Sequence, residues 1–407
     1  MPSNKSVLLS TYINTVNDET YALFGPIENI TGYLCRKFSD VYMISQPMSG
    51  EAELTPVLTY YKGGKVVWIK RMPKFLRMFY WVDPQKVTSN QTVVRLKVRD
   101  FISNIYFILF VVPGKLDLFI GVESINALSA ILLRMLGRLH TLLYFSNDYH
   151  PHRYTWFKNS IFLKLDEIAA CHGDYIWMMN PNIHESRLER GLDARRLAPH
   201  HIIHGGLPFF PGAPVPLVER KKNRIVYATR AGHQGLQIML EALSVVAGKY
   251  PDTTLYITGH ADREKPQILP LMQKLKISEN VVFTGFLKEA ELNDLVKCSW
   301  IGVAIWSCDS PASATYGDPE KIRRYFHFGL PVVSTPNAFT AETIKKHGAG
   351  IVADDEAKAV AAAICRLFSD DSLYAKCAQV SEGLGAFYKE HNTLDDSFDD
   401  LQKRQLL

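Results

Sequence analysis

The sequence predicts an α/β protein with two doubly wound, parallel sheets, and three observations support this fold class. Strand-like and helix-like segments alternate along most of its 407 residues. The composition, with 47% hydrophobic and 21% charged residues, supplies enough apolar material for two domains with their own cores. A glycine- and proline-rich segment near residue 215 is typical of a linker between domains.

The N-terminal half alternates between strands and helices, although less clearly than the rest. We expect strands at residues 7–9, 41–44, 118–121 and 142–145, with helices such as 126–138 and 156–170 between them. The linker, residues 205–223, contains three glycines and four prolines. We therefore place an N-terminal Rossmann-like domain at residues 1–210.

The C-terminal half alternates clearly. Its expected strands are residues 225–228, 254–258, 281–283, 300–305 and 332–333, and its expected helices include 236–247 and 289–296. Ligands bind at the carboxyl ends of such parallel strands. We expect a second Rossmann-like domain at residues 216–390 and a helical segment at 391–407.

The most informative segment is 316–335, where a polar loop leads into a helix and then abruptly into a strand. Pro319 fits the first helical turn, and Gly329 with Pro331 ends the helix before a β-branched run. A loop of this kind lies at the strand ends, where the N-terminus of the helix favours phosphate. The segment therefore predicts a binding site for a phosphorylated ligand.

This segment also resembles the donor-site signature of GT-B glycosyltransferases, especially glycosyltransferase family 4, which reads roughly P-x-K-x-x-E-Y-x-x-x-G-x-P-V-V. The matching residues are Lys321, Tyr325, Gly329, Pro331, Val332 and Val333. Arg324 and Tyr316 stand where family 4 has two glutamates, one for the nucleotide ribose and one for the sugar. Because a guanidinium accepts no hydrogen bond, the ribose contact is lost, moves to a neighbour such as Glu320, or is made by backbone groups.

The resemblance extends over residues 225–370. Arg230 matches the arginine of the family's diphosphate-binding loop, whereas Gln234 stands where the family has lysine. The resemblance implies a GT-B fold, with two Rossmann-like domains whose parallel sheets face a central crevice, and a terminal helix that crosses back to the first domain. It also implies a donor site formed by Arg230, Gln234, Tyr316, Glu320, Lys321, Arg324 and Gly329, with positive charge from Arg230, Lys321 and Arg324.

The acceptor side is expected after the strand at residues 142–145. Asp148 resembles the catalytic base of glycosyltransferase family 70, inverting glucuronosyltransferases that carry an aspartate in a similar Ser-Asp turn. Further acceptor-side candidates are Glu123, His150, His152 and Arg153. Asp148 and Glu123 also fit helix-capping roles and the histidines fit structural ones, so retention and inversion both stay open.

Charge is distributed unevenly, although the net value is only +5. Residues 60–99 hold ten basic residues and one acidic residue, interleaved with aromatic and aliphatic side chains. This composition predicts peripheral contact with an anionic membrane, and the alternative is a solvated face with its apolar side buried. No nucleic-acid motif accompanies the charge, and the longest apolar run, 105–112, is too short to span a bilayer.

The six cysteines form no C-x-x-C pair, and no secretory segment opens the sequence, so we expect a cytoplasmic protein without a metal knuckle or disulfides. The expected function is transfer of a sugar from a nucleotide-diphosphate sugar to a lipid-linked or polysaccharide acceptor in cell-surface glycan synthesis. We expect no metal and no further cofactor. The alternatives are a non-catalytic GT-B binding module and a GT-B nucleotide-sugar epimerase.

Overall fold

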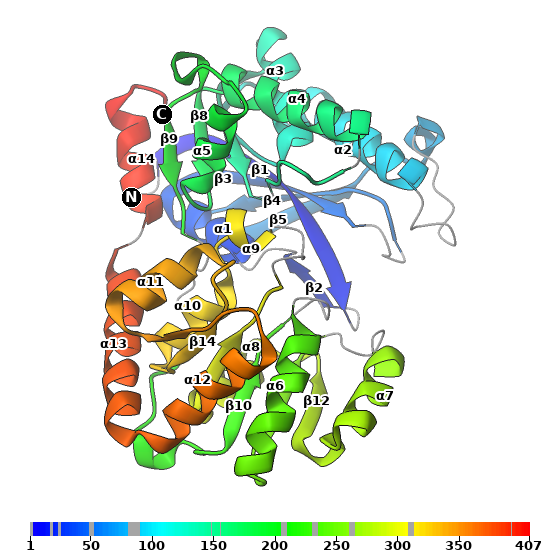
Figure 1. Cartoon of the computed structure of the whole chain (residues 1–407). Coiled ribbons are helices and arrows are strands. Elements are labelled where there is room, and N and C mark those ends of the chain that lie inside the picture. Colours follow the sequence, from blue (N-terminus) through cyan, green and yellow to red (C-terminus); the bar gives the residue numbers. More distant parts are fainter. Residues whose placement is uncertain are drawn as a thin grey trace. The chain divides into compact units, whose positions relative to one another are not determined.

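The computed structural model describes residues 3–16, 19–22, 26–48, 53–79, 90–147, 149–154, 156–204, 210–229, 235–259, 265–307, 313–391 and 393–407. The chain divides into two compact units (Figure 1). The N-terminal unit comprises Met1–Leu207 and Thr393–Leu407, and the C-terminal unit comprises Pro208–Asn392. The N-terminal unit is therefore assembled from both ends of the chain.

The N-terminal unit contains a mixed nine-stranded sheet in the order β5-β4-β3-β1-β6-β7-β8-β9, with β2 paired to β1. Its strands are β1 (Ser3–Val16), β2 (Glu19–Ala22), β3 (Phe38–Pro47), β4 (Val57–Lys62), β5 (Lys65–Arg71), β6 (Leu116–Val122), β7 (Leu139–Ser146), β8 (Tyr175–Met178) and β9 (His200–Ile202). Strands β3, β1, β6, β7, β8 and β9 run parallel, whereas β2, β4 and β5 pair antiparallel. The sequence pattern predicts the parallel strands β1, β3, β6 and β7, but neither the parallel strands β8 and β9 nor these three antiparallel ones.

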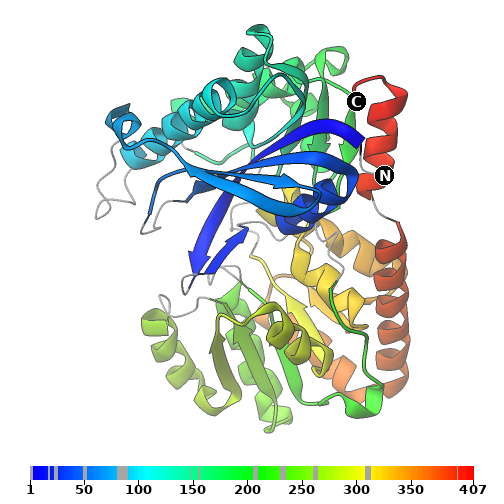
Figure 2. The same cartoon turned by 180° about the vertical axis from the view of Figure 1, so that it is seen from behind.

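Helices cover both faces of this sheet (Figures 1 and 2). They are α1 (Pro26–Lys37), α2 (Asn90–Phe110), α3 (Ser124–Met135), α4 (Trp156–His172), α5 (Asn182–Glu189) and α14 (Thr393–Lys403). A 3₁₀ helix, η1 (Lys74–Phe79), precedes α2. Helix α14 packs on this unit through Phe398, whose ring lies 5.5 Å from Tyr33 and 5.8 Å from Trp177 between centroids.

The C-terminal unit has a parallel six-stranded sheet in the order β12-β11-β10-β13-β14-β15. Its strands are β10 (Arg224–Tyr227), β11 (Thr254–Thr258), β12 (Val281–Gly285), β13 (Ile301–Ala304), β14 (Val332–Ser334) and β15 (Gly350–Val352). This is the 3-2-1-4-5-6 order of a Rossmann fold, and every strand expected in this half is present.

The helices of this unit pack against two apolar cores, one on each face of the sheet. They are α6 (Leu236–Lys249), α7 (Lys265–Leu275), α8 (Glu289–Lys297), α9 (Ser313–Tyr316), α10 (Glu320–His327), α11 (Phe339–His347), α12 (Ala357–Ser369) and α13 (Asp371–Glu390). Alternation along β10 fixes the two faces, because Ile225 and Tyr227 enter one core and Val226 enters the other. Within the described parts of the chain, no helix combines the length and apolar composition needed to cross a bilayer.

Candidate functional site

The strand order of the C-terminal sheet reverses between β10 and β13. The helices that follow these two strands cover opposite faces of the sheet. In a sheet of this type, ligands bind in the crevice that this leaves at the carboxyl ends of the two strands, here β10 and β13. Tyr227 ends β10, and Trp306 lies just beyond β13. Thr335 fixes the main chain of Trp306, accepting from its N–H at 2.9 Å and donating to its carbonyl at 2.8 Å.

Lys321 projects from the first turn of α10 to this point. Its Nζ lies 4.9 Å from the centre of the Tyr227 ring and 5.1 Å from that of Trp306. The ammonium is buried and, in the described part of the chain, has no hydrogen-bond partner. Burial lowers the pKa of Lys321 to about 7. A buried hydrogen-bond donor without a partner is unfavourable by about 1–3 kcal/mol. A bound anion would supply the hydrogen-bond acceptor and the negative charge that this ammonium lacks.

Helix α6 begins at the same place and offers a second feature suited to anions. Gly235 precedes the helix with φ 73° and provides no capping side chain. A Cβ at this glycine would lie 2.7 Å from the carbonyl oxygen of Ile305, so only glycine allows this close approach to the end of β13. An uncapped helix N-terminus beside Lys321 is suited to binding a phosphate.

Tyr325, another residue of the sequence motif, has a structural role. Its hydroxyl accepts from Ala228 N at 2.9 Å and lies 3.2–3.3 Å from the carbonyl oxygens of Val226 and Val303. It therefore joins β10 to β13 beneath the site. A Cβ at Gly302 would lie 2.5 Å from the Tyr325 ring, so this glycine makes room for the tyrosine.

The structure gives Arg324 and Glu320 a role that differs from the expected one. The guanidinium of Arg324 is buried, bonds both oxygens of Glu289 at 2.8 and 3.1 Å, and bonds Glu320 at 2.8 Å. It also contacts Asn293 and lies over the ring of Phe210, 4.3 Å from the ring centre. Two carboxylates already neutralise this cation, so we remove Arg324 from the phosphate-binding set.

The remaining donor-side candidates lie as follows. Gly329 follows α10 at φ 66°, where Arg220 donates to its carbonyl oxygen at 2.7 Å. Its role is to end the helix, because a Cβ there would lie 3.1 Å from Nη2 of Arg220. Tyr316 ends α9 and is half-buried. Arg230 and Gln234 lie outside the described residues.

In the N-terminal unit, the expected acceptor segment follows β7, and Asp148 itself lies outside the described residues. His150 is buried, and its Nδ1 accepts from His152 N at 2.9 Å, so it stabilises the turn. The guanidinium of Arg153 lies over the rings of Tyr154 and Phe162, 5.8 and 5.6 Å from their centres.

A buried ion pair supports this segment from below. Arg187 bonds Asp166 at 2.7 Å and donates to Oγ of Ser146 at 2.8 Å. The hydroxyl of Tyr144 donates to the same carboxylate at 2.7 Å. The last residues of β7 are thus held rigidly to α4 and α5.

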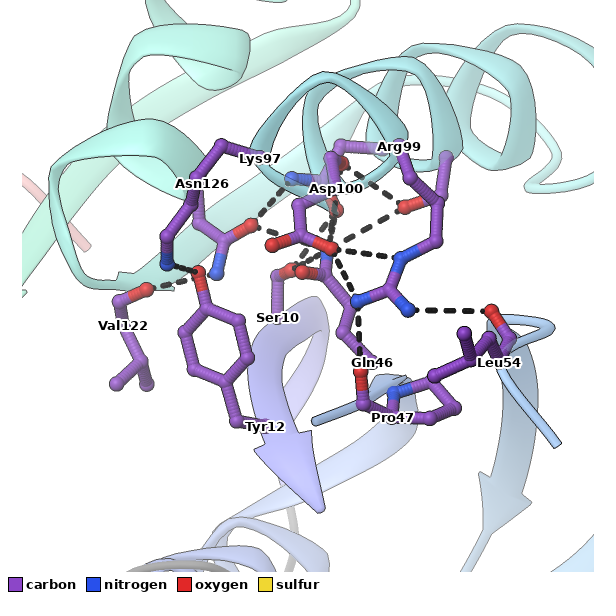
Figure 3. Close-up of polar contacts among 12 residues, drawn as sticks. Ser10, Tyr12, Gln46, Pro47, Leu54, Lys97, Arg99, Asp100, Val122 and Asn126 are labelled. Atoms are coloured by element: carbon purple, nitrogen blue, oxygen red, sulfur yellow. Dashed lines mark hydrogen bonds and ion pairs between the residues drawn. The ribbon is translucent and has the colours of Figure 1, made fainter. Parts of the chain in front are cut away.

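Glu123 immediately follows β6, and the structure brings it near two residues that the sequence pattern did not single out, Tyr12 and Lys97. Lys97 Nζ donates to the hydroxyl of Tyr12 at 2.7 Å (Figure 3). Burial is the main cause of the raised pKa of Tyr12 and of the lowered pKa of Lys97. The charge of the Glu123 carboxylate is close enough to raise the pKa of both groups.

A buried polar network lies beside this pair, between the sheet and α2 and α3 (Figure 3). Arg99 bonds Asp100 at 2.6 Å and donates to the carbonyl oxygens of Pro47 and Leu54 at 2.7 and 3.1 Å. The side chains that complete the network are Ser10, Gln46, Ser103, Asn104, Asn126 and Ser129. The signal in the sequence is a polar stripe at positions 97, 100 and 104, which share one face of α2.

Comparisons with known proteins bear on the fold and the family. Residues 222–370, which lie within the C-terminal unit, match the family model described as glycosyl transferases group 1. No curated protein sequence matches the chain significantly.

Several solved structures share the fold at low sequence identity. Sucrose-phosphate synthase from Thermosynechococcus elongatus is 12% identical, with 99% of this chain and 100% of that chain covered and a TM-score of 0.70. HepE of Anabaena, solved in complex with UDP and glucose, is 11% identical over 99% and 100%, with a TM-score of 0.62. WaaG, a glycosyltransferase involved in lipopolysaccharide biosynthesis, is 11% identical over 93% and 95%, also with a TM-score of 0.62. The chain is therefore a glycosyltransferase of the GT-B fold, and its C-terminal unit carries a glycosyl transferases group 1 domain.

Proposed function

We propose that this glycosyltransferase takes its sugar from a nucleotide-diphosphate sugar and transfers it to a lipid-linked or polysaccharide acceptor in cell-surface glycan synthesis. The observation that carries the donor assignment is the buried ammonium of Lys321 at the strand-order reversal of the C-terminal sheet, which has no hydrogen-bond partner in the part of the chain that the structure describes. A diphosphate would pair with this cation and with the N–H groups at the start of α6. HepE, whose complex contains UDP, and WaaG, which acts in lipopolysaccharide biosynthesis, support the same assignment.

The proposed reaction is a direct displacement. The acceptor hydroxyl attacks the anomeric carbon, the bond from that carbon to the diphosphate breaks, and the electron pair leaves with the diphosphate. Lys321, together with Arg230, stabilises the departing charge. Asp148 takes the proton of the attacking hydroxyl, which makes the transfer an inverting one.

We further propose that the acceptor is reached at an anionic membrane surface. Exposed apolar side chains cluster on β5, η1 and the start of α2, among them Ile69, Phe75 and Met78 with exposed fractions of 60%, 67% and 76%. Exposed basic residues surround them, namely Lys62, Lys65, Lys70, Arg71, Lys74 and Arg95. Lys97 and Arg99, which the sequence placed on this surface, belong instead to the polar network of Figure 3.

The test is a screen of UDP-, GDP- and ADP-sugars, which combines thermal shift with release of the free nucleotide. Our proposal requires both a rise in unfolding temperature and release of nucleoside diphosphate with at least one donor. A shift without release would identify a binding module, whereas conversion of the sugar without release of nucleotide would identify an epimerase. The proposal is overturned if no donor raises the unfolding temperature and none releases nucleoside diphosphate.

A further inference from the structure

The N-terminal sheet has its own reversal of strand order, between β1 and β6. Pairing of these two strands ends at Ser10 with Gly121. Tyr12 lies beyond this point on β1, and Glu123 lies beyond it after β6. Because ligands bind at the carboxyl ends of parallel strands where the strand order reverses, this is the expected ligand-binding position of the N-terminal sheet.

The backbone of Glu123 is strained. It has φ 71° and ψ 157°, a region that glycine adopts readily and other residues adopt at a cost of about 1–3 kcal/mol. Its main chain is held in place, because its N–H donates to Phe145 O at 3.0 Å and its carbonyl accepts from Ala127 N at 3.3 Å. The side chain makes no capping hydrogen bond to α3. Helix capping therefore does not explain why a glutamate occupies a position suited to glycine.

The charge of the Glu123 carboxylate acts on the neighbouring pair Tyr12 and Lys97. Lys97 is bonded to Tyr12 at 2.7 Å, and its ammonium lies 4.4 Å from the centre of that ring. The other nearby acid, Asp100, is already bonded twice by Arg99, at 2.6 and 2.9 Å. Within the described contacts, Lys97 is thus a cation near this end of β1 that is not bonded to a carboxylate.

Unsatisfied polar atoms occur at the same edge of the sheet. Oγ1 of Thr11, Oε1 of Gln46 and Nδ2 of Asn147 have no hydrogen-bond partner within the described residues. The three side chains are at least nine-tenths buried, with exposed fractions of 0%, 0% and 6%. Gln46 and Asn147 lie at the carboxyl ends of β3 and β7, whereas Thr11 faces the opposite side of β1 from Tyr12. Strand ends with spare donors and acceptors are suited to a polyhydroxylated ligand, because an unsatisfied group gains a partner on binding.

We propose that Glu123, supported by Tyr12 and Lys97, binds a hydroxyl of the carbohydrate acceptor next to the attacking one and so fixes the direction of approach. The carboxylate accepts a hydrogen bond from this neighbouring hydroxyl, while Asp148 receives the proton of the attacking hydroxyl during transfer. The strained backbone is kept because it places the carboxylate at the strand end, where a relaxed conformation would not. This assignment rests on the proposed glycosyl transfer and identifies where its acceptor binds.

The test compares Glu123→Gly and Glu123→Gln in the full chain, with UDP-glucose, or the donor found in the screen, as substrate. Lys276→Gly is the matched control, since Lys276 also has positive φ, at 57°, and lies in a turn of the C-terminal unit. Both glycine variants should unfold at a higher temperature than the wild type. The two Glu123 variants should bind UDP with unchanged affinity and release it from the donor about 100-fold more slowly, the effect of losing the position of a reacting group. Lys276→Gly should turn over normally.

A lower unfolding temperature for Glu123→Gly would show a structural role and overturn the inference. Normal turnover by Glu123→Gln, in a wild-type background that does turn over, would also overturn it while leaving the proposed function intact. A wild type that neither binds nor turns over any nucleotide sugar would overturn both.

Discussion

Lys321 is the residue at which the sequence motif and the structure agree most directly. The motif match places this lysine in the donor site, and the structure places its ammonium between two aromatic rings, with no hydrogen-bond partner among the described residues. The same motif also contains Tyr325 and Gly329, whose roles are structural: one joins two strands and the other ends a helix. A motif read from sequence does not separate ligand contacts from the residues that support them, because both occupy fixed positions along the chain.

We predict that Lys321→Met weakens UDP binding by about 1.5–3 kcal/mol, the range for hydrogen bonds to charged groups. The same change should raise the unfolding temperature of the free protein, because it removes a buried cation for which the described residues supply no hydrogen-bond partner. Isothermal calorimetry and a thermal scan measure the two effects. Lys358→Met, at an exposed lysine of α12, is the control and should change neither. Unchanged UDP affinity for Lys321→Met would remove this residue from the donor site.

The pKa of Lys321 leads to a second prediction. Its folded-state value of about 7 lies below the ordinary value of 10.5, so the free protein holds this lysine largely neutral at pH 8.5. A bound diphosphate favours the charged form and raises the pKa. UDP binding at pH 8.5 should therefore take up a proton, and affinity should fall as pH rises above 7. Calorimetry in buffers of different ionisation enthalpy measures the proton uptake, which Lys321→Met should abolish.

The same pKa has a consequence for stability. Because the folded pKa is lowered, the unfolded chain binds this proton more readily, and the lysine destabilises the fold below pH 10.5. The stability gained by Lys321→Met should be greatest below pH 7 and should shrink as pH rises from 7 toward 10.5. Denaturant unfolding of both proteins across this range measures the difference.

The proposed role of Asp148 as catalytic base leads to a further prediction for a single residue. Asp148→Asn keeps the shape of the side chain but removes its ability to take a proton, so UDP should still bind while turnover falls about 100-fold to 10,000-fold. NMR of the anomeric proton of the product supplies an independent measurement. A product that retains the configuration of the donor would assign a retaining mechanism and contradict the proposed role of Asp148.

At the scale of elements, residues 60–99 form the β4–β5 hairpin, η1 and the first half of α2, which their composition alone does not predict. The turn Gly63–Gly64 has φ values of 54° and 78°, and glycine pairs are favoured in tight hairpin turns. Composition indicates only a basic, aromatic segment. The strands are indicated instead by the alternation of side chains along the sequence before and after the two glycines. Trp68 illustrates the difference, since it packs against Tyr60 at 5.3 Å within the hairpin instead of facing solvent fully.

We predict that this surface binds vesicles containing anionic lipid, and that binding falls steeply between low and high salt because surface charges are screened. The triple change Lys65→Glu, Lys70→Glu and Lys74→Glu should abolish co-sedimentation. An equal change of charge elsewhere, Lys345→Glu, Lys346→Glu and Lys358→Glu, should leave it intact. Failure of the wild type to sediment with anionic vesicles at low salt would refute membrane docking through this surface.

At the scale of the whole molecule, the C-terminal unit follows from the sequence more completely than the N-terminal unit. Its central strands are short, buried on both faces and rich in β-branched residues, as in residues 225–227, so each is visible as a local apolar run. The N-terminal unit adds antiparallel strands and a polar network that connects Ser10, Gln46 and Asn104. The polar stripe of α2 is a local signal, but no local pattern connects it with residues as far away in sequence as Ser10 and Tyr12, so the sequence does not predict that Tyr12 and Lys97 pair.

Helix α14 provides a prediction for the N-terminal unit as a whole. Phe398 is fully buried among Tyr33, Phe38 and Trp177. Phe398→Ala should destabilise this unit by about 3–5 kcal/mol, as for other buried phenylalanines. Denaturant unfolding followed by tryptophan fluorescence measures the loss. Phe387→Ala, at a ring on α13 that is 49% exposed, is the control and should have a much smaller effect.

The return of the chain to its first unit also sets an order of folding during synthesis. Residues 208–392 form one continuous unit and contain all the partners of their own cores. The N-terminal unit emerges from the ribosome first, yet it lacks Phe398 and the hydroxyl of Ser397, which accepts from the indole N–H of Trp177 at 2.6 Å, until translation reaches α14. The unit translated first is therefore the last to complete its packing, and until then the ring of Trp177 lacks its cover.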